Sequence, residues 1–136
     1  MTRRWFIAAA LLVLSCAGVG SIAAQEPKTI DPQSLIGEWW GDMVGDAYSW
    51  KTYLTLKSVQ DAGKLAGSVY VVVPTTGTGT AYGNRDNPVT ATLDGDRLSF
   101  AVMNGPEYTV TVSGKTMTGT YRGIRISGPV SFTKVK

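Results

Sequence analysis

Apolar and polar residues alternate with a period of two through most of the chain after residue 36. Within residues 48–59, for example, Trp50, Leu54 and Leu56 share one face of an extended chain, and mostly polar side chains share the other. This period is typical of β-strands with one buried face. The pattern predicts eight strands, over residues 37–43, 48–59, 64–73, 89–93, 97–103, 107–112, 116–122 and 129–135.

Short glycine-containing turns separate the later strands. The pairs Asp94-Gly95, Asn104-Gly105 and Ser113-Gly114 supply the positive φ values that two-residue hairpins need. The chain is therefore expected to be all-β, an antiparallel up-and-down meander of about eight strands. Closure of the meander into a barrel removes its two exposed edges. The interior of such a barrel is filled by side chains or holds one small ligand.

The first 24 residues have the features of a secretory signal peptide. Arg3 and Arg4 precede an apolar run over residues 5–14, and small residues lead to Ala23-Ala24. The run is shorter than the 20 or so residues that a transmembrane helix needs. We expect cleavage after Ala24, a flexible lead-in over residues 25–34 and a barrel domain over residues 35–136. The mature protein is then periplasmic or secreted.

A second way of processing the same segment involves its cysteine. Residues 13–16, Val-Leu-Ser-Cys, resemble the lipobox of bacterial lipoproteins, in which the cysteine is lipidated and becomes the first residue. Lipidation of Cys16 would anchor the protein to a bacterial membrane. The alternative is that Cys16 is an ordinary small residue of a peptide that is removed.

Composition excludes several kinds of chemistry. The chain has no histidine and one cysteine, so catalytic triads with histidine, histidine-ligated zinc and thiolate clusters are absent. Residues 25–136 carry a net charge of +1, against +3 for the whole chain, and no cluster of basic residues. We expect no enzyme activity, no metal, no cofactor and no nucleic-acid partner.

Residues 37–39, Gly-Glu-Trp, resemble the Gly-x-Trp motif on the first strand of the calycins, and Gly119-Thr120-Tyr121 resembles a late motif of small secreted bacterial lipocalin-like barrels. The resemblance implies that Trp39 plugs one end of the barrel. It also implies that a basic residue near the chain end packs on this tryptophan, for which Arg125, Lys134 and Lys136 are candidates.

Two groups within this superfamily give more specific expectations. Avidins line their biotin site with tryptophans from middle and late strands, whereas this chain has no tryptophan after Trp50, so biotin binding is not expected. Small periplasmic protease inhibitors share the barrel and commonly carry a disulfide, which this chain cannot form in its mature part.

Candidate ligand-binding residues come from the inward positions of the strands and from one loop. Residues 74–87 form a long loop rich in glycine and threonine, which is expected to gate the barrel mouth. Arg85 within it is suited to an anionic head group, or to a local pair with an aspartate. The residues expected to surround an interior ligand are Trp50, Leu54, Val71, Phe100, Tyr108 and Tyr121.

The first hypothesis for function is binding of a small apolar or amphipathic molecule inside the barrel. The second is protein–protein interaction through a barrel with a filled interior, as in a protease inhibitor or an accessory subunit. The third is an isomerase or cyclase in a barrel pocket. Trp40 must point away from Trp39, so it is expected outside, where a loop, a partner or a lipid would cover it.

Overall fold

The computed structural model describes residues 29–46, 49–72, 83, 85–123 and 125–136. Its elements, in chain order, are η1 (Pro32–Leu35), β1 (Gly37–Val44), β2 (Ser49–Val59), β3 (Lys64–Val72), β4 (Asp86–Asp94), β5 (Arg97–Ala101), β6 (Glu107–Ser113), β7 (Thr116–Arg122) and β8 (Ser127–Lys134). Each strand pairs antiparallel with the next, and β8 pairs with β1, so the sheet is a closed barrel. The predicted eight-stranded meander and its closure are confirmed.

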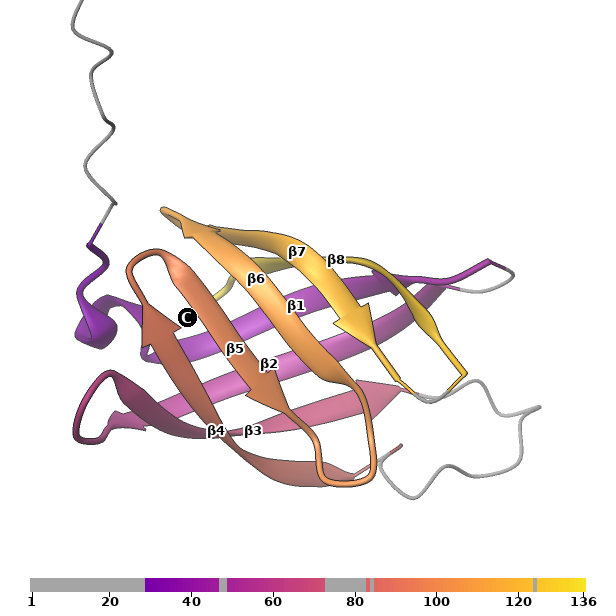
Figure 1. Cartoon of the computed structure of the whole chain (residues 1–136), viewed down its shortest axis with the longest axis horizontal. Helices are drawn as coiled ribbons and strands as arrows, with labels where there is room; N and C mark the ends of the chain where they lie inside the picture. The colour runs from indigo at the N-terminus through magenta and orange to yellow at the C-terminus, as the bar shows by residue number, and fades with distance from the viewer. Residues whose placement is uncertain (1–28, 47–48, 73–82, 84, 124) are drawn as a thin grey trace, which may run out of the picture.

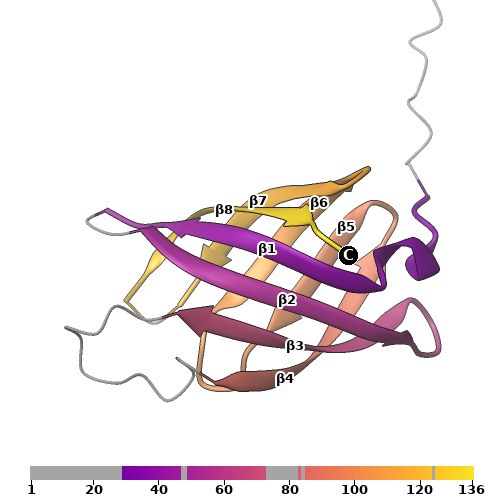
Figure 2. The ribbon, with the colours of Figure 1, turned by 180° about the vertical axis from the view of Figure 1, so that it is seen from behind.

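The two ends of the barrel differ. Figures 1 and 2 show η1, the C-terminus and the β2–β3, β4–β5 and β6–β7 turns at one end, called the closed end here. The connections from β1 to β2, β3 to β4, β5 to β6 and β7 to β8 lie at the other end, called the mouth. Most of the loop expected over residues 74–87 lies outside the described residues.

Three strand boundaries differ from the sequence prediction by two residues or more. β4 begins at Asp86 rather than at residue 89, because Tyr70 and Val69 of β3 extend the ladder to Asp86 and Asn87. β5 ends at Ala101 rather than at residue 103. The Val102 N–H donates to Pro106 O at 3.0 Å, so the turn between β5 and β6 is wider than the two-residue turn expected at Asn104-Gly105. β8 begins at Ser127, two residues earlier than predicted, because it pairs with Arg122 of β7.

The expected flexible lead-in, residues 25–34, overlaps a defined element. Pro32–Leu35 is a 3₁₀ helix whose N-cap, Asp31, accepts a hydrogen bond from the Gln33 N–H at 3.0 Å. A proline in the first turn and an aspartate cap are both suited to a helix start. The helix places Leu35 in the core, where it is buried.

Trp39 closes the barrel at the η1 end. Its side chain is 0% exposed, and its indole N–H donates to Leu35 O at 2.9 Å. The Lys134 ammonium lies 5.7 Å from the centre of the Trp39 ring and donates to Ser34 O at 2.7 Å. Of the three basic candidates, Lys134 is therefore the one that packs on Trp39, where it adds a cation–π contact to the plug.

The backbone conformation of residue 37 and its close contact with the chain end explain why the Gly-x-Trp motif begins with glycine. Gly37 has φ +135°, and a Cβ at this position would lie 2.9 Å from the carbonyl carbon of Lys136. Residue 37 therefore allows the chain end to pass close beside β1. The Glu38 N–H donates to Lys136 O at 3.0 Å, and the Val135 N–H donates to Glu38 O at 2.9 Å.

Aromatic rings fill the middle of the barrel. Phe100 and Tyr108 stack with ring centres 4.6 Å apart, and Phe132 lies 6.1–6.2 Å from both rings. The Tyr108 hydroxyl donates to the Met43 sulfur at 3.2 Å and lies 3.5 Å from the Thr52 hydroxyl. All five side chains are buried, so this level of the interior is occupied by the protein's own side chains.

Candidate functional site

A cavity of about 280 Å³ lies at the mouth of the barrel. Trp50 of β2, Tyr121 of β7 and Ile126 of the β7–β8 connection supply its apolar surface. Its polar boundary is formed by Gly45, Asp46, Arg125 and Ser127. The cavity is slightly smaller than most ligand sites, and polar surface outweighs apolar surface in its lining, whereas most ligand sites are mainly apolar.

The strands hold the aromatic wall of this mouth cavity in place. Trp50 pairs in register with Met43, whose buried side chain lies beside it on the same face of the sheet. The Tyr121 hydroxyl donates to Val44 O at 2.9 Å, which joins β7 to the end of β1 across the mouth. Tyr121 is thereby fixed at its hydroxyl, and with 4% of its surface exposed it shows only a small part of its ring to the cavity.

Charged groups of both signs line the mouth cavity. Arg125 carries a permanent positive charge, and the Asp46 carboxylate lies on the same boundary. The Ser127 hydroxyl adds a neutral donor and acceptor. These groups suit a ligand whose apolar part contacts Trp50 and whose polar part stays at the entrance.

The structure separates the predicted ligand-binding residues into two groups. Trp50 and Tyr121 line the mouth cavity. Leu54, Val71, Phe100 and Tyr108 belong to the buried core, and so does Tyr121, which is 4% exposed like Phe100. A role in ligand binding for these residues stays a prediction, and the packing of the second group fills the level of the interior where the sequence suggested a ligand.

Arg85 is exposed and directly precedes β4, at the mouth of the barrel. Its carbonyl accepts a hydrogen bond from the buried Asn87 side-chain amide at 3.0 Å. Among the described residues, the ion pairs join Lys51 to Asp42 and Lys136 to Glu38, so neither involves Arg85. Its proposed contact with an anionic head group stays a prediction, and Cys16 lies outside the described residues.

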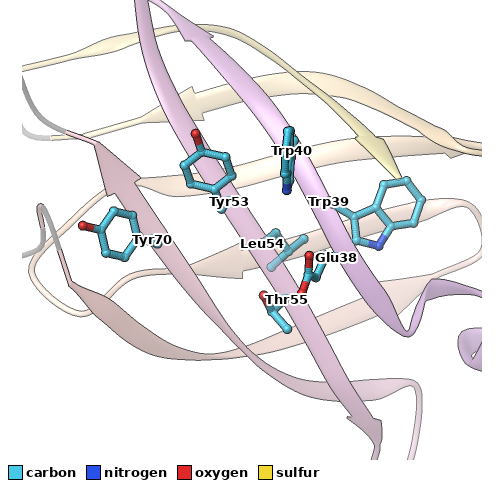
Figure 3. A pocket seen from close by; sticks show the side chains of 7 residues that line it. All are labelled: Glu38, Trp39, Trp40, Tyr53, Leu54, Thr55 and Tyr70. Carbon is cyan, nitrogen blue, oxygen red and sulfur yellow. The ribbon is translucent and has the colours of Figure 1, made fainter. Parts of the chain in front are cut away.

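A second hollow, here called the outer groove, lies on the outside of the barrel (Figure 3). It has a volume of about 390 Å³ and is lined by Glu38, Trp40, Tyr53, Thr55 and Tyr70, with the buried Trp39 and Leu54 beneath it. The prediction that Trp40 points outward is confirmed, since it is 56% exposed. The sequence analysis did not single out Tyr53 and Tyr70.

Comparison with known proteins gives likenesses of fold. The apo form of shwanavidin is 17% identical with a TM-score of 0.48, over 75% of this chain and 97% of that chain. A phenylalanine-to-alanine variant of shwanavidin in complex with biotin is 18% identical with a TM-score of 0.47, over 82% and 100% of the two chains. An asparagine-to-alanine variant of the fluorescent protein UnaG is 11% identical with a TM-score of 0.44, over 76% and 98%.

The three structures resemble this chain in fold only, at sequence identities of 11–18%. No family model matches the chain, and no curated protein matches it. The arrangement of the mouth cavity and the outer groove therefore has to be interpreted from this chain's own residues.

Among the described residues there is no group of three or more side chains that could ligate a metal ion. A helix with the length and apolar character required to cross a bilayer is likewise not found among the described residues.

Proposed function

We propose that this protein binds one small amphipathic molecule in the mouth cavity of its barrel. The observation that carries the proposal is the contrast between the two levels of the interior. Phe100, Tyr108 and Phe132 occupy the middle, whereas Trp50 and Tyr121 border an open space above them. Binding there requires no histidine, cysteine or metal, consistent with a role in binding rather than in catalysis.

Octanoate and octanol form a matched pair of probes for this cavity, because they share the apolar chain and differ in the charge of the polar group. We expect both to cause saturable shifts of the Trp50 indole N–H signal in NMR titrations. Arg125→Ala should weaken octanoate binding about fivefold, the effect of losing one solvent-exposed charge contact. Asp46→Asn should strengthen octanoate binding, and neither substitution should change octanol binding more than about twofold.

Arg97→Ala is the matched control, since Arg97 is exposed and begins β5 at the closed end. It should leave the affinity of both probes unchanged. Shifts that do not saturate, or an octanoate affinity that is the same in the Arg125→Ala and Asp46→Asn variants, would contradict the proposed site.

The filled middle of the barrel also supports a second candidate, interaction with another protein through the outer surface. Native mass spectrometry of the freshly purified protein separates the two functions. Additional mass of a few hundred daltons that is lost on denaturation supports the ligand-binding proposal. A clean mass together with failure of the octanoate titration favours the interaction module.

We also propose that the protein is exported and that its first 24 residues are removed. The basic start, the short apolar run and Ala23-Ala24 support this proposal. Expression of the full chain in a bacterial host should give a periplasmic protein that begins at Gln25, as measured by intact mass. A product that begins at a lipidated Cys16 and is lost in a Cys16→Ala variant would instead establish the lipid anchor, and an uncleaved cytoplasmic product would refute export.

A further inference from the structure

Three aromatic side chains form a continuous row across the outer groove. Trp40 of β1 pairs in register with Tyr53 of β2, which pairs with Tyr70 of β3. The ring centres of Trp40 and Tyr53 are 5.7 Å apart, with their planes at 85°. Those of Tyr53 and Tyr70 are 6.3 Å apart, with their planes at 50° (Figure 3). The row therefore presents two nearly perpendicular ring faces and a third tilted one.

The outer groove is lined by negative charge. Glu38 is the one lining residue with a charged side chain at neutral pH, and its position on β1 is two residues before Trp40 on the same face. The faces of aromatic rings also carry negative charge density. Carboxylate and ring faces together make the groove attractive to a cation and unfavourable for an anion.

Two basic side chains near the outer groove are paired with carboxylates. Lys51, two residues before Tyr53 on the same face of β2, forms an ion pair with Asp42. The hydrogen bond to Asp42, together with its charge, raises the pKa of Lys51. The Lys136 ammonium lies 3.9 Å from the Glu38 carboxylate with its side chain 78% exposed, a contact that contributes little and that a bound cation can replace.

We propose that the outer groove binds a small quaternary ammonium group. Such a cation is weakly hydrated, and its methyl groups contact ring faces while its charge is attracted to them, as in known aromatic cages. The walls are Trp40, Tyr53 and Tyr70, and Glu38 supplies the balancing charge. This site lies on the outside of the sheet and is independent of the mouth cavity.

Choline and its uncharged analogue 3,3-dimethylbutan-1-ol test the proposal, because they have the same shape and differ only in the charge. We expect choline to shift the Trp40 indole N–H signal of the full protein saturably, with an affinity at least tenfold above that of the analogue. Equal shifts with the two probes, or no saturation with choline, would overturn the proposal.

Substitutions assign the binding to these side chains. These affinities are measured by isothermal titration calorimetry, because Trp40→Ala removes the indole N–H signal. Trp40→Ala should weaken choline binding about tenfold and Glu38→Gln about threefold, while Tyr53→Phe, which keeps the ring, should change it less than twofold. The matched controls are Met103→Ala, which removes an 81% exposed apolar side chain elsewhere, and Glu107→Gln, which neutralises an exposed glutamate on β6. Choline affinities that are the same in Trp40→Ala and in the controls would overturn the proposal.

The same chemistry is present in a free solute and in a lipid head group, and vesicles distinguish the two sources. Retention on phosphatidylcholine vesicles that is lost in Trp40→Ala, with no retention on phosphatidylglycerol vesicles, supports the lipid. Saturable binding of choline without retention on vesicles supports the free solute. Retention that is unaffected by Trp40→Ala, together with no choline binding, would refute the site.

Discussion

Replacement of Trp39 by alanine is expected to lower the free energy of unfolding by about 3–5 kcal/mol, the usual cost of removing a buried large aromatic side chain. Trp39 is fully buried, donates a hydrogen bond to Leu35 O and lies under Lys134. Its loss leaves a cavity at the closed end and removes the partner of both η1 and β8. Urea unfolding followed by circular dichroism measures the change.

The neighbouring tryptophan is the matched control for this experiment. Trp40→Ala removes the same side chain from the next position of β1, where it is 56% exposed and contacts Tyr53 from outside. We expect a loss below about 1 kcal/mol. Equal losses for the two variants would contradict the assignment of Trp39 as the plug.

Gly119→Ala is expected to cost at least about 3 kcal/mol, above the usual range for one added methyl group in a packed core. A Cβ at Gly119 would lie 2.7 Å from Val110 Cα and nearer still to the Thr109 carbonyl oxygen. Both atoms belong to the backbone of β6, which pairs with β7 at this level, so neither can rotate away. The same urea experiment measures the loss, and failure of the variant to fold would agree with it.

Gly114→Ala is the control for the loss at Gly119. Gly114 lies in the β6–β7 turn with φ +59°, and an added Cβ would meet no atom within 4 Å. Its cost is therefore that of the left-handed backbone alone, about 1 kcal/mol. A loss at Gly119 no larger than this one would show that β6 and β7 adjust to a side chain at that level.

The fold could be predicted because it depends on local patterns. Alternation placed Trp39 inside and Trp40 outside, and the Gly95 and Gly114 turns ended β4 and β6 within a residue of the expected places. β4 was predicted too short because Asp86 and Asn87 are polar. In the structure, the Asn87 amide is satisfied by the carbonyls of Val69 and Arg85, a contact that no local pattern reveals.

The candidate sites could not be predicted from the sequence, because their positions depend on strand register and on core packing. Tyr53 and Tyr70 become neighbours of Trp40 only through strand register, and they lie on the faces that alternation marks as solvated. Whether the interior is open or filled depends on how Phe100, Tyr108 and Phe132 pack together. The choice of Lys134 over Arg125 likewise requires the β1–β8 register, because both residues are basic and lie near the chain end.

The pairing of β1 with β8 also determines how the barrel can be attached to anything else. The chain enters β1 beside η1 and leaves β8 next to Lys136, so both connections are at the closed end (Figure 2). A lipid, a linker or a fused domain joined at either side would therefore hold the barrel by its base. In that orientation the mouth is the end of the barrel that points away from the attachment.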